Sequence, residues 1–150
     1  MTTSCPPTAA PIGILLVDDQ PAMLWGLEFL IDGERPRMAV VGKATGRAAA
    51  LQMAAQAQPD VILLDLDLAG ELSLDFLPEL LCLSPARVLI FTGMQDHALH
   101  ERALREGACG VVHKEENAEA LLQAIVRAAN TIGGRSPMQP RLADEQIIVE

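Results

Sequence analysis

Short runs of branched apolar residues alternate with longer segments of helical periodicity along most of the chain. We predict strands at five such runs: Ile12–Val17, Met38–Val41, Val61–Leu64, Arg87–Phe91 and Cys109–Val112. We predict helices at roughly 21–32, 46–57, 73–82, 96–106 and 117–130, after each strand in turn. Asp96 and Asn117 are N-cap residue types at the starts of the last two helices, and Gly107 can end the fourth.

Strands that alternate with helices indicate βαβ units and therefore a parallel sheet. Several runs are apolar at every position, which is typical of strands covered on both faces. We therefore expect an α/β fold with a doubly wound, five-stranded parallel sheet, helices on both faces and the flavodoxin-like strand order 2-1-3-4-5. The folded domain should span residues 12–130, after a flexible Pro-containing tail at 1–11. Residues 131–150 show no clean periodicity, so we interpret them as a linker.

Composition restricts the partners of the chain and its location. With 20 acidic and 11 basic residues and a formal net charge of −9, the chain should be repelled by nucleic acid and by anionic membranes. No apolar run approaches the roughly 18 residues of a transmembrane helix, and the N-terminus lacks a secretory signal pattern. Cys5, Cys82 and Cys109 show no metal-type spacing, and the last two lie in apolar segments. This pattern favours buried, reduced thiols in a cytoplasmic protein.

Acidic residues follow two strands that should be neighbours in the sheet. Asp18 and Asp19 follow the first strand, and Asp65 follows the third directly. Neighbouring strands lie about 4.8 Å apart, so these three carboxylates should meet at the carboxyl edge, where such folds bind ligands. Like charges this close require a cation or a bound proton. Their oxygen atoms suit a hard cation such as Mg²⁺.

The fourth and fifth strands should bring a hydroxyl and an ammonium group to the same edge, from Thr92 and Lys114. Both groups can bind phosphate oxygens. Together with the carboxylates they describe a site for placing a phosphoryl group on Asp65. Each residue alone also has an ordinary interpretation, as a strand-end carboxylate, hydroxyl or snorkelling lysine. Their convergence on one edge favours the phosphoryl chemistry.

Four motifs give the chain a clear resemblance to the receiver domain of two-component response regulators. They are VDDQP at 17–21, LLDLDLAG at 63–70, FTG at 91–93 and GACGVVHK at 107–114. The motifs occur in the order and at the intervals usual for that family, and they cover nearly the whole predicted domain.

The resemblance implies a role for each matching residue. Asp65 corresponds to the phosphoacceptor, which takes its phosphoryl group from a sensor histidine kinase. Asp18, Asp19 and Asp65, with the backbone carbonyl of Asp67, correspond to the ligands of Mg²⁺ or Mn²⁺. Thr92 corresponds to the switch hydroxyl and Lys114 to the phosphate-binding lysine.

Smaller details resemble the NarL/LuxR-type branch of that family. They are the DDQP motif, Glu115 in place of the frequent proline after the lysine, and the Thr131–Gly134 stretch after the last helix. Members of that branch usually carry a C-terminal helix-turn-helix domain, which this sequence lacks. The resemblance therefore implies that 131–150 leads towards an output domain, through which alone DNA would be bound. It also implies a signalling protein rather than an enzyme, with at most self-phosphorylation from small phosphodonors and self-dephosphorylation.

Three positions depart from the usual receiver pattern. Val111 occupies the place usually held by Tyr or Phe, whose ring moves together with the switch threonine. Ala69 and Ser73 replace a frequent proline and a frequent glycine in the loop after Asp65. We expect the phosphoryl chemistry to survive these changes, whereas the form of the switch does not follow from the family pattern.

Two other functions stay open at this point. Asp65-x-Asp67 after an apolar strand also resembles the first motif of Mg²⁺-dependent haloacid-dehalogenase-type phosphatases, although those enzymes place that motif on the first strand. Steady turnover of a phosphate ester would favour such a phosphatase. A receiver-like adaptor that is never phosphorylated is the other alternative, although degenerate receivers usually lose one of the residues that this chain keeps.

Trp25 and Phe29 should lie on the outer side of the first helix, opposite the residues that face the sheet. One interpretation is that the N-terminal tail or the linker covers them. The other is a partner surface, for a homodimer or an output domain, because exposed neighbouring aromatic residues favour interfaces. We assign no role to the histidines: His97 and His100 should line a solvated helix, and His113 should pack on the side opposite to Lys114.

Overall fold

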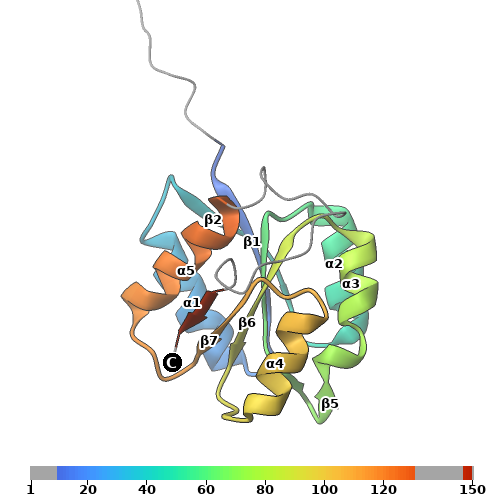
Figure 1. The fold of residues 1–150 in the computed structure, drawn as a ribbon. Coiled ribbons are helices and arrows are strands. Elements are labelled where there is room, and N and C mark those ends of the chain that lie inside the picture. The colour runs from blue at the N-terminus through green and yellow to red at the C-terminus, as the bar shows by residue number, and fades with distance from the viewer. Residues whose placement is uncertain (1–9, 131–146, 150) are drawn as a thin grey trace, which may run out of the picture.

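The computed structural model describes residues 10–130 and the backbone of residues 147–149 (Figure 1). Its elements are β1 (Ile12–Val17), α1 (Pro21–Asp32), β2 (Met38–Ala44), α2 (Arg47–Ala57), β3 (Val61–Leu64), β4 (Asp67–Leu68), β5 (Glu71–Leu72), the 3-10 helix η1 (Ser73–Asp75), α3 (Leu77–Leu83), β6 (Arg87–Thr92), α4 (His97–Arg105), β7 (Gly110–His113), α5 (Ala118–Asn130) and β8 (Ile147–Val149).

The main sheet has the strand order β2-β1-β3-β6-β7-β8, and its strand pairs are parallel. The first five are the five predicted strands in the predicted order, so the doubly wound fold is confirmed. β8 is an additional strand, which pairs with β7 within the range that we interpreted as a linker. A strand of three residues is too short to show a periodicity of its own. The rest of that range, and residues 1–9 of the tail, lie outside the described residues.

Helices cover both faces of the sheet, with α1 and α5 on one side and α2, α3 and α4 on the other (Figure 1). Alternate residues of each central strand pack into opposite layers: Leu15 and Ile62 face the α2–α4 side, whereas Leu16 and Leu63 face the α1–α5 side. These strand residues are at most 2% exposed. Burial on both faces explains why the strands are apolar at every position.

The predicted helix ends are present in the structure. The Oδ1 atom of Asp96 accepts hydrogen bonds from the backbone N–H groups of Ala98 and Leu99 at the start of α4. Asn117 caps α5 in the same way, with its Oδ1 atom 2.8 Å from the nitrogen of Ala120. Gly107 follows α4 with a φ of +120°, which favours glycine.

The segment after β3 differs from the prediction of one helix over 73–82. A short antiparallel hairpin, β4 and β5, turns through Ala69 and Gly70, which both have positive φ. Two central residues with positive φ are typical of tight hairpin turns, but Ala-Gly is not among their usual sequences. The helical region then starts as η1 and is interrupted at Phe76 before α3 begins.

Two further observations concern the cysteines and the membrane. Cys109 is buried and reduced as expected, but Cys82 is exposed, because it lies on the side of α3 that faces solvent.

In the described part of the chain no helix has both the length and the apolar character required to cross a bilayer.

Candidate functional site

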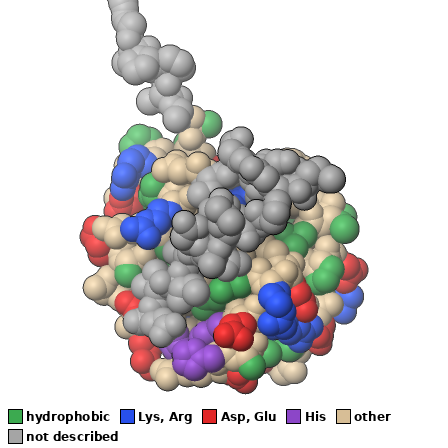
Figure 2. Space-filling model, viewed as in Figure 1, with side chains coloured by type: hydrophobic (Ala, Val, Ile, Leu, Met, Phe, Trp, Pro, Cys, Tyr) green, Lys and Arg blue, Asp and Glu red, His purple; other side chains and the backbone are tan. Residues whose placement is uncertain are grey.

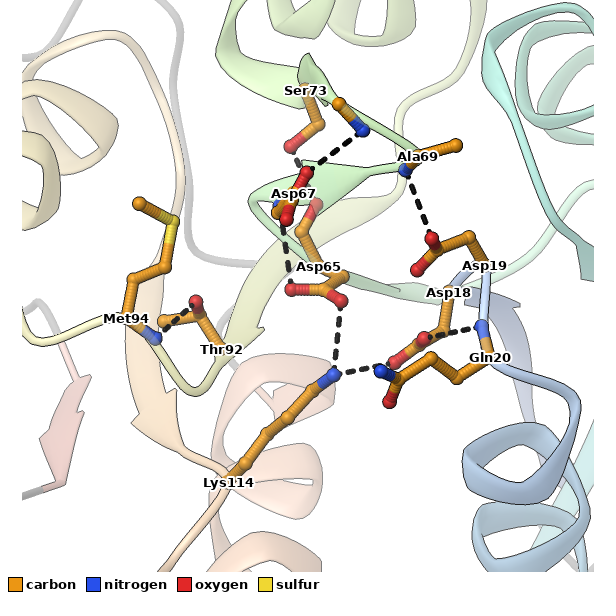
Figure 3. Close-up of polar contacts among 11 residues, drawn as sticks. Asp18, Asp19, Gln20, Asp65, Asp67, Ala69, Ser73, Thr92, Met94 and Lys114 are labelled. Atoms are coloured by element: carbon orange, nitrogen blue, oxygen red, sulfur yellow. Dashed lines mark hydrogen bonds and ion pairs between the residues drawn. The ribbon is translucent and has the colours of Figure 1, made fainter.

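Asp18, Asp19 and Asp65 lie together at the carboxyl edge of the sheet (Figure 3). Val17 of β1 pairs with Leu64 of β3, so the residues that follow them emerge side by side. Each of the three aspartates places one oxygen atom within 4.8 Å of the other two. Asp18 and Asp65 are only 2% and 6% exposed, so their charges are largely removed from water.

Lys114 connects the two most buried carboxylates. Its Nζ atom lies 2.8 Å from Oδ2 of Asp18 and 2.9 Å from Oδ2 of Asp65 (Figure 3). The ammonium group also lies 6.0 Å from the centre of the Phe91 ring, within range of a cation–π contact. One ammonium group therefore faces a cluster of three carboxylates, which leaves the site with excess negative charge.

The pKa values of Asp65 and Lys114 are both raised. Burial raises the pKa of Asp65 above the usual carboxyl value of 3.8, and the negative charge of Asp18 adds to this effect, although Lys114 opposes it. For Lys114, burial alone would lower the pKa, but the hydrogen bonds to Asp18 and Asp65 and their negative charges raise it above 10.5. Lys114 is therefore charged at neutral pH, and burial makes ionisation of Asp65 less favourable than that of a carboxyl group in water.

Asp19 is oriented by the loop after Asp65. Its Oδ2 atom accepts a hydrogen bond of 2.9 Å from the backbone N–H of Ala69. A proline at position 69, which is frequent in receivers, would have no N–H to donate and could not adopt the φ of 53° found here. The departure at Ala69 thus provides a contact that holds Asp19 at the acidic cluster.

Ser73 fixes the backbone of Asp65 and is a residue whose contribution we did not predict. Its Oγ atom donates a hydrogen bond of 2.6 Å to the carbonyl oxygen of Asp65, and its backbone N–H donates to Leu66. Ser73 is fully buried. A polar residue in an apolar stretch directly after the predicted acidic loop was the signal available in the sequence.

Asp67 lies at the exposed start of β4. Its backbone N–H donates a long hydrogen bond of 3.4 Å to Oδ1 of Asp65, and its own Oδ1 atom accepts from Gly70. Its side chain therefore stabilises the hairpin turn, and only its backbone is directed to Asp65.

Thr92 ends β6 at the same edge and is fully buried. Its Oγ1 atom accepts a hydrogen bond of 3.0 Å from the backbone N–H of Met94 (Figure 3). The carbonyl oxygen of Met94 in turn accepts a hydrogen bond of 2.8 Å from Nε2 of His100 in α4. His100 is therefore buried and bonded, which corrects our expectation that it lines a solvated helix surface.

The remaining predicted positions lie away from these polar groups. Val111 is 1% exposed and packs in the core layer on the α2–α4 side. Trp25 and Phe29 are 77% and 83% exposed on the outer side of α1, whereas Leu24, Leu27 and Ile31 of that helix are buried.

Comparisons with known proteins point to one family. The family model described as the response regulator receiver domain matches residues 14–126. The nitrate/nitrite response regulator protein NarL of Escherichia coli is 35% identical over 120 residues, which are 79% of this chain and 55% of that protein. Protein-glutamate methylesterase/protein-glutamine glutaminase 3 of Myxococcus xanthus is 36% identical over 116 residues, 74% of this chain and 32% of that protein. The chain thus spans about half, or less, of the length of these relatives.

Among solved structures, a LuxR-family two-component response regulator from an Aurantimonas species is similar with a TM-score of 0.74. It is 34% identical in sequence, and the match covers 91% of this chain and 95% of that one.

Proposed function

Because the chain belongs to the response-regulator receiver family, in its NarL/LuxR-type branch, we propose that Asp65 accepts a phosphoryl group from a sensor histidine kinase. The observation that carries this proposal is the position of the Asp65 carboxylate, which is buried beside Asp18 and Asp19 and held by Lys114. The resulting aspartyl phosphate would switch a separate output domain that regulates transcription. We place the protein in the cytoplasm, where a reduced, buried Cys109 is stable.

In the transfer, a carboxylate oxygen of Asp65 forms the new O–P bond while the N–P bond of the donor phosphohistidine breaks. The leaving imidazole nitrogen keeps the bonding electron pair and takes up a proton. Lys114 already contacts Oδ2 of Asp65, so its ammonium group is positioned to bind an oxygen of the incoming phosphoryl group. Ser73 holds the backbone of Asp65 in place during the reaction.

The acidic cluster fits a divalent hard cation, because three carboxylates converge and only one ammonium group balances them. Asp18, Asp19 and Asp65 would hold Mg²⁺ or Mn²⁺, together with the backbone carbonyl of Asp67 that the family resemblance implies. When bound, the cation neutralises negative charge on the transferring phosphoryl group. Asp19 is already held towards the cluster by Ala69.

Magnesium should stabilise the parent chain but not the Asp19→Asn variant. At ten times the dissociation constant, Mg²⁺ should add about 1.4 kcal/mol to the free energy of unfolding of the parent. The variant should fold well, because an asparagine oxygen can still accept the N–H of Ala69, and it should be at least as stable as the metal-free parent. Thermal melts with and without millimolar Mg²⁺ measure this difference, and an equal shift in both proteins would refute the site.

We infer that the switch acts through the start of α4 instead of through an aromatic ring at position 111. The hydroxyl of Thr92 can donate to a phosphoryl oxygen on Asp65, and it is joined to α4 through Met94 and His100. A displacement of Thr92 would therefore be transmitted to the loop before α4, where no aromatic ring is required.

A receiver and a phosphatase differ in the rate at which they hydrolyse a phosphate ester over many cycles. With p-nitrophenyl phosphate and Mg²⁺ we expect release of nitrophenol no faster than self-dephosphorylation permits, because a receiver holds one phosphoryl group per chain. Turnover much faster than the loss of the phosphoryl group from isolated phosphorylated protein would favour the haloacid-dehalogenase-type alternative. DNA binding is assigned to the output domain, because this chain carries a net charge of −9.

We propose that Trp25 and Phe29 form a homodimer surface on α1. They lie within one helical turn of each other and are largely exposed, which is costly for aromatic residues in water. The double variant Trp25→Ala/Phe29→Ala should weaken self-association and leave phosphorylation of Asp65 intact. Sedimentation velocity with and without phosphodonor measures this, with Leu83→Ala on α3 as the control for removing an exposed apolar side chain. Association unchanged from the parent would show that the dimer uses another surface.

A further inference from the structure

The three histidines of the chain lie together although they come from two different elements. His97 and His100 are one turn apart on α4, and His113 ends β7. The ring centres of His97 and His100 are 6.0 Å apart, and those of His100 and His113 are 5.7 Å apart, both in edge-to-face geometry. All imidazole groups of the sequence are therefore concentrated at one place, which we call the histidine cluster.

The histidine cluster opens into a surface cavity of about 300 Å³. The cavity is lined by Gln95, His97, His100, His113, Glu115 and Glu116. Every one of these side chains carries a nitrogen or oxygen atom that can bind a metal ion. Figure 2 shows the histidines as one purple patch next to acidic side chains. Glu115 and Glu116 form no ion pair with a basic residue of the described chain, so their negative charge is available to a cation.

The hydrogen bond of His100 determines which of its nitrogen atoms can act as a ligand. Nε2 lies 2.8 Å from the carbonyl oxygen of Met94, and a carbonyl oxygen can only accept, so Nε2 carries the proton. In the neutral ring the lone pair is then on Nδ1. A histidine that donates one N–H to a backbone carbonyl and presents its other nitrogen is the arrangement found in most metal-ligating histidines.

The imidazole ring of His113 has no hydrogen bond to any of the described residues, although His113 is only 9% exposed. His100 is 7% exposed, and its Nδ1 atom likewise has no such bond. An imidazole nitrogen without a partner among the described residues can bind a metal ion that enters the cavity. A metal ion at the mouth of the cavity would bind both rings.

We propose that the histidine cluster binds a divalent transition-metal ion such as Zn²⁺ or Co²⁺, with His100 and His113 as ligands. Imidazole nitrogen is a preferred ligand of these ions, and two imidazoles with a carboxylate form a common catalytic or regulatory set. The third ligand comes from His97, Glu115 or Glu116, all at the cavity wall. Among the described residues only the acidic cluster already places three ligand atoms within 4.8 Å. To bind a metal ion, the histidine cluster must therefore bring its ligand atoms closer together by side-chain rotation. The ring of His97 and the carboxylate of Glu115 are exposed, which permits this rotation.

Such an ion would join the end of β7 to α4, the helix that follows the loop that contains Met94. It would differ from the ion of the acidic cluster in chemistry, because nitrogen ligands select Zn²⁺ and Co²⁺ over Mg²⁺. The site lies outside the phosphoryl-transfer residues, so its existence does not depend on the proposed function of Asp65.

Cobalt titration of the parent chain tests the proposal. With excess Mg²⁺ to occupy the acidic cluster, Co²⁺ should produce the visible absorption of a low-symmetry nitrogen and oxygen site that saturates at one equivalent, and Zn²⁺ should displace it. His100→Gln and His113→Gln should each weaken the binding by at least about tenfold, as expected when a ligand or its orienting contact is lost. Gln in place of His100 keeps an N–H donor for Met94, so the loop contact is preserved.

Two controls separate this site from other ligands of the chain. Asp19→Asn, which disrupts the acidic cluster, should bind Co²⁺ like the parent. Absence of a thiolate-to-cobalt charge-transfer band should show that no cysteine contributes. Circular dichroism melts confirm that each variant is folded. Cobalt binding that is unchanged in both histidine variants, or that disappears in Asp19→Asn, would overturn the proposal, as would the lack of any saturable binding to the folded parent.

Discussion

Replacing Lys114 with methionine should lower the free energy of unfolding by about 3–5 kcal/mol at neutral pH in the absence of Mg²⁺. The Lys114 ammonium group is the cation that contacts both Asp18 and Asp65, and the two carboxylates would be left buried with no positive charge beside them. Methionine keeps the apolar length of the side chain, so the loss arises from charge and hydrogen bonding. The variant should also lose phosphoryl transfer, because the group that binds the phosphoryl oxygen is absent.

Urea unfolding measures this effect, and Lys43→Met is the matched control. Lys43 pairs with Glu28 at 2.7 Å, but both side chains are more than a third exposed, so that pair should contribute about 1 kcal/mol or less. Millimolar Mg²⁺ should restore part of the stability of Lys114→Met, because the metal replaces some of the missing positive charge. Equal losses in the two variants would contradict the central role of Lys114.

The contribution of Lys114 should depend on pH with a defined sign. Its pKa in the folded protein is raised above the unfolded value of 10.5. The resulting stabilisation is complete below pH 10.5 and is lost as the pH rises through the folded-state pKa. Stability of the parent should therefore fall in alkaline solution more steeply than that of Lys114→Met.

Replacing Asp65 with asparagine should abolish phosphoryl uptake and increase the stability of the metal-free protein at neutral pH. The pKa of Asp65 is raised above 3.8 in the folded state, chiefly by burial. A raised carboxyl pKa favours folding below pH 3.8 and opposes it increasingly as the pH rises through the folded-state value. The uncharged amide avoids this cost, so the stabilisation should be present at pH 7 and absent near pH 3.

Asp67→Asn is the matched control for this variant. The side chain of Asp67 is exposed and accepts the N–H of Gly70, which an asparagine oxygen can also accept. The backbone next to Asp65 is then unchanged, and labelling by phosphoramidate should persist. Labelling of Asp65→Asn at the parental level would show that another residue receives the phosphoryl group.

The sequence predicted the sheet and the acidic cluster because both depend on simple periodic rules. The largely apolar strands β1, β3 and β6 required cover on both faces, and the strand order brought Asp18 and Asp65 to adjacent strand ends. Asp96 and Asn117 marked helix starts through their own hydrogen bonds. These features are local, or follow from the parallel topology.

The features that were missed depend on particular tertiary contacts that no periodic pattern in the sequence encodes. The burial of His100 follows from its bond to Met94 and from His113, which is 13 positions further along the chain. The role of Ser73 depends on the position of the Asp65 carbonyl, and the donor role of Ala69 depends on a positive φ that alanine rarely adopts. β8 is defined by pairing with β7 and has no signal of its own in three residues.

The central claim is that Asp65 is the phosphoacceptor, and intact-mass spectrometry after exposure to phosphoramidate and Mg²⁺ tests it most directly. The parent should gain the mass of one phosphoryl group, lose it on treatment with hydroxylamine, and yield a borohydride-reduced peptide in which Asp65 is modified. No mass gain under conditions where the chain is folded, or a stable phosphoryl group on a residue other than Asp65, would contradict the account.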